Sequence, residues 1–137
     1  MGNATGHIVD WAVFGRARTE LGADFVRILG YFREDGIKSL TEIEEAMRAR
    51  SAVALVRPAH TLKGESLQFG AEPLALLAEQ IELVARRCVE TRDEPDELLE
   101  VVVKLRPLFE ETLALFANEI NPLVNRRPTS GFGRKVA

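Results

Sequence analysis

The stretch "SAVALVRPAHTLKGESLQFGAEPLALLAEQIELVARRC", residues 51–88, carries two apolar stripes with the spacing of an α-helix. Gly70 stands where a glycine commonly ends a helix, and Pro73 fits the first turn of the next helix. The pattern therefore predicts two helices joined by a short link, over about 51–69 and 73–88. Their stripes are Ala52, Leu55, Val56, Ala59, Leu62, Ser66 and Phe69, and then Leu74, Leu77, Ala78, Ile81, Val84, Ala85 and Cys88.

Two longer apolar stripes flank this pair of helices. The first predicts a helix over about 19–48, with Thr19 as a candidate N-cap. Gly36 falls on that stripe, which predicts a bend or close packing, and two helices broken at Asp35-Gly36 are the alternative. The second stripe predicts a helix over about 95–120, which Pro107 should kink.

The ends of the chain differ from this helical middle. Residues 8–14 form a short apolar piece whose Trp11 and Phe14 should cap one end of the core. Residues 123–137 are rich in Pro, Gly and basic side chains, which predicts a flexible C-terminal tail. The fold we expect over 1–122 is all-α: an antiparallel up-down four-helix bundle with a short extra N-terminal helix.

Composition narrows the class of protein. The 137 residues are 46% hydrophobic and 28% charged, with a formal net charge of −3. A slightly negative net charge without a concentrated basic face argues against a nucleic-acid binder. The single cysteine, Cys88, excludes an intrachain disulfide and fits a reducing compartment. No apolar run reaches the roughly 20 residues of a membrane span, and no secretion signal opens the chain, so we expect a cytoplasmic protein. We also expect a monomer.

His60 lies on the side of its helix that should face solvent. At about 100° per residue, it falls roughly 130° from the centre of the apolar stripe. Gly64, one turn on, would clear its approach, and Lys63 and Arg57 would bring positive charge that suits an anion. Leu67 is apolar but lies outside the stripe, as in a protein contact. The alternatives are an ordinary solvated histidine, and a Lys63 that merely offsets a carboxylate such as Glu65.

The segment "HTLKGESLQFGAEPLALLAEQIE", residues 60–82, resembles the signature of histidine phosphotransfer domains. The matching positions are His60, Leu62, Lys63, Gly64 and Gly70. Residues 8–32 are similar to the start of that family's first long helix. The resemblance implies that His60 accepts a phosphoryl group and passes it on. It implies response-regulator receiver domains and a hybrid sensor histidine kinase as partners, with Mg²⁺ bound by the receiver and no cofactor on this chain.

Further roles follow from the resemblance. Glu82 matches the position that can hydrogen-bond the active imidazole, and the alternative is a Glu at the rim of the helix, exposed to water. Gly70 either permits close backbone packing beneath the site or simply ends the helix. Docking is expected on the His60 face, through Leu67 and Gln68 and near Phe32. Glu65 stands where the family often has a small residue, and we assign it no chemistry.

These expectations define a phosphocarrier that is a substrate of its partners rather than an enzyme. It would relay a phosphoryl group between receiver aspartates in a multistep phosphorelay. The main alternative is a bundle that binds or inhibits a kinase or receiver through the same face without being phosphorylated. A metal or general-base site is disfavoured, because His7 is the only other histidine and no metal-ligand spacing occurs. The cognate partners, and whether the chain is free-standing or part of a larger protein, stay open.

Overall fold

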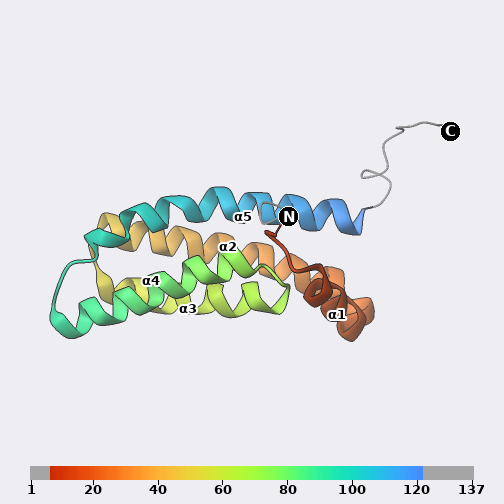
Figure 1. The fold of residues 1–137 in the computed structure, drawn as a ribbon, viewed down its shortest axis with the longest axis horizontal. Helices are drawn as coiled ribbons and strands as arrows, with labels where there is room; N and C mark the ends of the chain where they lie inside the picture. The colour runs from red at the N-terminus through yellow and green to blue at the C-terminus, as the bar shows by residue number, and fades with distance from the viewer. Residues whose placement is uncertain (1–6, 122–137) are drawn as a thin grey trace.

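The computed structural model describes residues 7–121 and confirms the predicted all-α fold (Figure 1). A short helix precedes four long ones that run up and down in turn. Their bounds are α1 (Trp11–Leu21), α2 (Phe25–Arg48), α3 (Ala52–Gln68), α4 (Glu72–Thr91) and α5 (Leu99–Ile120). The predicted flexible tail, 123–137, lies outside the described residues.

The N-terminal boundary differs from the prediction. Thr19 caps no helix, because it lies inside α1. The N-cap of α1 is Asp10, whose side chain accepts hydrogen bonds from the backbone N–H groups of Ala12 (3.0 Å) and Val13 (3.3 Å). Gly22, with a φ of +56°, ends α1, and a short 3-10 turn over Gly22–Asp24 leads into α2. A single predicted helix is therefore two helices joined at a glycine.

Gly36 is a site of close packing rather than a break. Helix α2 runs uninterrupted from Phe25 to Arg48, so the alternative of two helices broken at Asp35-Gly36 is wrong. A Cβ at position 36 would collide with the ring of Phe109 on α5. The missing side chain thus lets a phenylalanine from α5 sit directly on the α2 backbone. Pro107 lies within α5, and Pro58 within α3.

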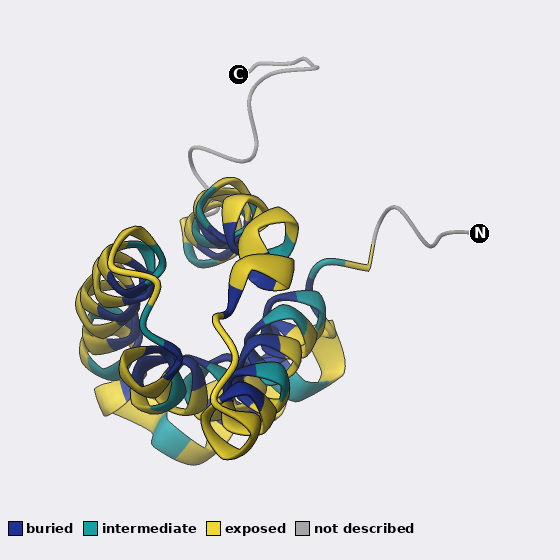
Figure 2. Cartoon of the chain, turned by 90° about the vertical axis from the view of Figure 1, so that its left-hand side faces the viewer, coloured by how far each residue is buried: buried dark blue, intermediate teal, exposed yellow. Residues whose placement is uncertain are grey.

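The core contains a cluster of phenylalanines toward the α1 end of the bundle. Phe14 stacks on Phe116 at 4.8 Å between ring centroids, and Phe32 lies 5.5 Å from Phe69. Trp11 packs edge-on against Phe14 at 5.1 Å, so these two residues cap one end of the core, as predicted. Figure 2 shows the buried positions facing inward on the four long helices. Burial of such large rings supplies much of the stability of a small bundle.

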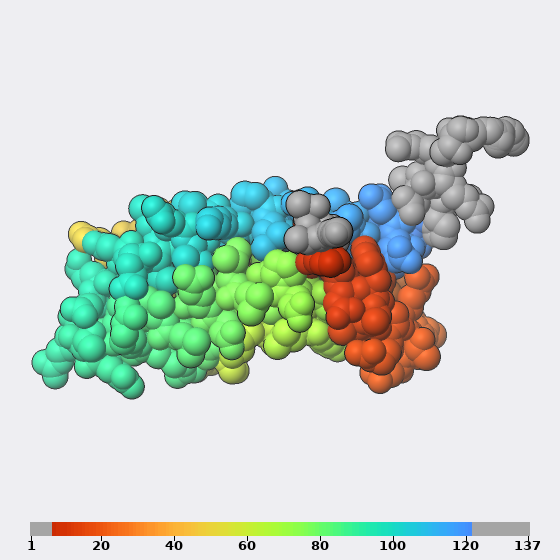
Figure 3. Space-filling view, in the orientation of Figure 1, coloured from red at the N-terminus to blue at the C-terminus, as the bar shows by residue number. Residues whose placement is uncertain are grey.

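Gly70 joins α1 to the turn between α3 and α4. Its φ is +80°, the left-handed conformation that glycine adopts at helix ends. Its carbonyl accepts a hydrogen bond from the N–H of Asp10 at 2.8 Å, and a Cβ there would collide with the Asp10 carbonyl. Gly70 thus ends α3 and also permits close packing, but against the start of α1. Figure 3 shows the resulting cover of α1 over one end of the bundle.

None of the helices between residues 7 and 121 combines the length and apolar character that crossing a membrane requires.

Candidate functional site

His60 projects from the outer face of α3. Its side chain is 62% exposed, which agrees with the position expected from helical periodicity. Gly64, one turn later, is exposed, and a Cβ added there would meet no atom within 4 Å. The surface beside the imidazole is therefore open to a partner molecule.

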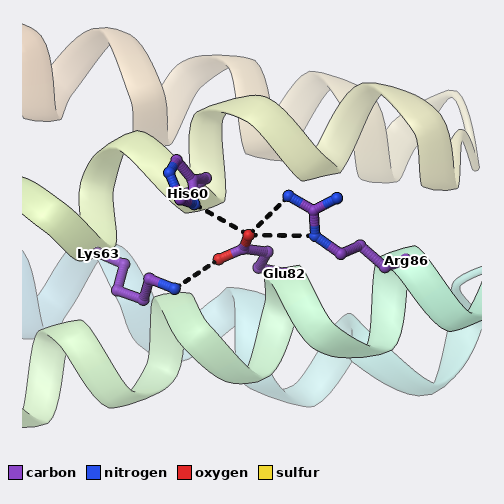
Figure 4. Close-up of polar contacts among 4 residues, drawn as sticks. All are labelled: His60, Lys63, Glu82 and Arg86. Carbon is purple, nitrogen blue, oxygen red and sulfur yellow. Dashed lines mark hydrogen bonds and ion pairs between the residues drawn. The ribbon is translucent and has the colours of Figure 1, made fainter.

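Glu82 reaches the imidazole from α4 (Figure 4). Its Oε2 lies 2.9 Å from His60 Nδ1, and its side chain is only 5% exposed. An ionised carboxylate can only accept a hydrogen bond, so Nδ1 must carry the proton and donate it. In the neutral ring, Nε2 is then the nitrogen with the free lone pair. The rim position offered as the alternative for Glu82 is wrong, because the side chain is buried between the helices.

Two cations hold the Glu82 carboxylate in place. Lys63 Nζ pairs with Oε1 at 3.0 Å, and Arg86 binds Oε2 through Nη2 at 2.9 Å and through Nε at 3.1 Å. Burial alone would raise the pKa of Glu82. The hydrogen bonds from Lys63, Arg86 and His60 outweigh it and lower that pKa to about 2. Glu82 is therefore a carboxylate at neutral pH.

Arg86 is the site residue that the sequence analysis missed. It follows Glu82 by four residues on α4, a spacing that places a Glu and an Arg side by side on a helix surface. That spacing could have identified it once Glu82 was a candidate. Lys63 does pair with a carboxylate, as one alternative held, but the partner is Glu82, which itself contacts His60.

The other predicted site residues fall into two groups. Arg57, Leu67 and Gln68 are exposed on α3, and Leu67 is 52% exposed despite its apolar side chain. Among the described residues, no hydrogen bond or ion pair joins Arg57 to the His60 and Glu82 pair. Phe32 is 2% exposed and packs on Phe69 and Phe109, so its prediction as a docking residue is wrong. Its ring belongs to the core.

Glu65 occupies the other side of α3, where it meets Asp35 of α2. Burial and the neighbouring Asp35 carboxyl raise the pKa of Glu65 to about 7. Its Oε1 is buried and has no hydrogen-bond partner. Nothing in this arrangement assigns chemistry to Glu65, in line with the sequence analysis.

A four-helix bundle that exposes one histidine beside a lysine and a small residue defines the class of histidine phosphotransfer domains. The comparison with protein families agrees, because residues 27–120 match the family model described as the Hpt domain. The chain belongs to the Hpt domain family. Domains of this family are phosphocarriers in phosphorelays and not catalysts, so the chain is a phosphocarrier rather than a stand-alone enzyme.

A solved structure extends this comparison. The chain is similar to histidine-containing phosphotransfer protein B (HptB) from Pseudomonas aeruginosa PAO1, at 26% sequence identity and a TM-score of 0.72. The match covers 85% of this chain and 96% of that one. No protein with a curated description matches the chain.

Proposed function

We propose that this protein relays a phosphoryl group between the aspartates of receiver domains in a multistep phosphorelay, through a phosphohistidine at His60. The observation that carries the proposal is the hydrogen bond between His60 Nδ1 and the buried, ionised Glu82. That bond leaves Nε2 as the nucleophile, on a side chain that is 62% exposed.

The chemistry is an in-line displacement at phosphorus. The Nε2 lone pair attacks the phosphorus of an aspartyl phosphate, so an N–P bond forms while the P–O bond to the aspartate breaks. The electron pair of the broken bond returns to the aspartate carboxylate. Nδ1 keeps its proton, and the positive charge that develops on the ring is stabilised by Glu82. A second receiver aspartate then attacks the same phosphorus and releases the neutral imidazole.

The charges around His60 suit the transferred group. Lys63 and Arg86 each carry one positive charge against the single negative charge of Glu82, so the cluster keeps one positive charge in excess. An excess of that sign stabilises a phosphoryl group on Nε2. Arg57, exposed three residues before His60, adds a cation at the rim. Gly64 leaves room for the receiver to approach.

Docking is proposed on the α3 face around His60. Leu67 and Gln68 are exposed about two turns after His60, and Val53, 69% exposed, lies seven residues before it. Exposed apolar side chains on both sides of the histidine favour a protein partner. We expect the receiver to supply Mg²⁺, a hybrid sensor histidine kinase to supply the phosphoryl group, and the chain itself to act as a cytoplasmic monomer.

The test is incubation with a receiver domain whose aspartate carries labelled phosphate. The wild type should take up acid-labile label, and His60→Gln should take up none. His7→Gln is the matched control, because His7 is the only other histidine, is exposed and lies outside the site. Equal labelling of the His60→Gln variant would show the proposal to be wrong.

The same variant separates the alternative of a bundle that binds without being phosphorylated. A pure binder needs no lone pair on Nε2, so His60→Gln would keep its full signalling function. A phosphocarrier loses signalling in that variant even where binding to the receiver persists.

A further inference from the structure

An apolar groove between α2 and α5 lies away from the phosphotransfer site. It has a volume of about 560 Å³ and is lined mainly by aliphatic and small side chains, among them Val26 and Leu29 of α2 and Leu113, Ala117 and Ile120 of α5. None of its lining residues lies on α3 or α4, the helices that carry His60 and Glu82. Its apolar surface is therefore not explained by docking of a receiver at His60.

The groove ends where the described chain ends. Helices α2 and α5 run antiparallel, so the last turns of α5 lie beside the first turns of α2 (Figure 1). Ile120 is both the last residue of α5 and part of the groove lining. The next residues, 122–127, read "PLVNRR". Two branched aliphatic residues thus follow the groove within four positions of its edge.

We propose that this groove binds the segment 122–127 of the same chain. Leu123 and Val124 would occupy the apolar part beside Val26 and Ala117. A segment tethered at the groove edge has a high effective concentration there, which favours it over an untethered ligand.

The charges favour the same occupant. Four of the chain's 18 Lys and Arg side chains lie in 122–137, and none of its 21 Asp and Glu side chains does, so the rest of the chain carries a formal charge of −7. The charged residues that line the groove are Arg33 and Glu110. Glu110 lies ten residues before Ile120, about 15 Å along the helix. Five or six extended residues span roughly 17–20 Å, so Arg126 and Arg127 can reach Glu110.

The experiment uses methyl-labelled full-length protein in solution NMR. Nuclear Overhauser effects are expected between the methyl groups of Leu123 or Val124 and those of Val26 or Leu113. The double variant Leu123→Asp with Val124→Asp should shift the Val26, Leu29 and Leu113 methyl resonances. The double variant Phe132→Asp with Val136→Asp is the matched control, since it places the same two negative charges beyond the proposed segment, and it should leave those resonances where they are.

Two outcomes would overturn the proposal. The first is that those methyl contacts are absent and the double variant leaves the groove resonances unchanged. The second is that the contacts appear only between differently labelled copies in a mixed sample, which would identify a second copy as the occupant. A label-uptake assay distinguishes failure of this proposal from failure of the one at His60. The double variant Leu123→Asp with Val124→Asp should accept label from a phosphorylated receiver at the wild-type rate, whether or not the segment binds the groove.

Discussion

Two glutamates that lie on opposite sides of α3, the buried Glu82 and the half-buried Glu65, have pKa values shifted in opposite directions. At the seam with α4, Glu82 accepts hydrogen bonds from a histidine, a lysine and an arginine, and its pKa falls to about 2. At the seam with α2, Glu65 meets another carboxyl group, Asp35, and its pKa rises to about 7.

The difference shows that donors, rather than burial, decide the state of a carboxyl group in this bundle. Burial raises the pKa in both cases. Of these two glutamates, only Glu82 has neighbouring cations that reverse the direction of its pKa shift, and only its carboxylate adjoins an exposed nucleophile. We therefore expect substitutions at Glu82 to affect phosphotransfer and substitutions at Glu65 to affect stability.

Among substitutions of the two glutamates and of their partners other than His60, Glu82→Leu should have the largest effect on the rate of phosphotransfer. This variant removes the acceptor that holds the proton on Nδ1, so the ring loses its fixed tautomer and orientation. The initial rate of label uptake from a phosphorylated receiver should fall about 10- to 100-fold. Glu82→Gln should lose less, because its amide oxygen can still accept from Nδ1.

The matched control for that experiment is Glu65→Leu, which makes the same change on the other side of α3. It should keep a rate within about twofold of the wild type, with folding of both variants checked by circular dichroism. A wild-type rate in Glu82→Leu would remove the distinction between the two glutamates.

The second prediction concerns stability in acid. Because the folded-state pKa of Glu82 lies below the ordinary 4.5, its contribution is present above pH 4.5 and is lost as the pH falls toward 2. The full shift corresponds to about 3 kcal/mol, and solvent screening of the cations reduces this to about 1–2 kcal/mol. Urea unfolding from pH 6 to pH 2.5 should show this loss in the wild type relative to Glu82→Gln. An unchanged difference between the two proteins would contradict the prediction.

The third prediction concerns stability at higher pH, where the free energy of unfolding should fall as the pH rises. The folded-state pKa of Glu65, about 7, lies above its ordinary 4.5, so its contribution is complete below pH 4.5 and disappears as the pH rises through 7. With partial exposure to solvent, we expect a loss of about 1 kcal/mol between pH 5 and pH 8. The free energy of unfolding of Glu65→Gln should lack this decline, as should that of Asp35→Asn. A parallel decline in all three proteins would place its origin elsewhere.

Local sequence patterns predicted the elements around the site but not every contact between them. The apolar stripes of residues 51–88 identified α3 and α4, and Gly70 marked their turn, because each signal lies within one helix or one link. Phe32 lies on the apolar stripe that predicted the helix over 19–48, and its burial follows that stripe rather than the docking surface expected near it.

What depends on how two helices are aligned was harder to predict. The contact between Glu65 and Asp35 requires the register of α3 against α2, which no pattern within either helix determines. The same holds for Gly36, whose packing on Phe109 joins α2 to α5. Glu82 could be matched to His60 through the family resemblance, whereas its burial under two cations became evident only in the structure.

The smallest effect is expected for Arg86→Ala. Arg86 binds the oxygen of Glu82 that accepts from His60 Nδ1, but it is 54% exposed and Lys63 still pairs with the other oxygen. The carboxylate should therefore keep its charge and lose part of its orientation, and the transfer rate should fall about threefold, in line with a partly exposed ion pair. Arg87→Ala is the matched control, because the neighbouring Arg87 pairs with Glu97 instead. If the two variants transfer label equally fast, Arg86 has no part in positioning the imidazole.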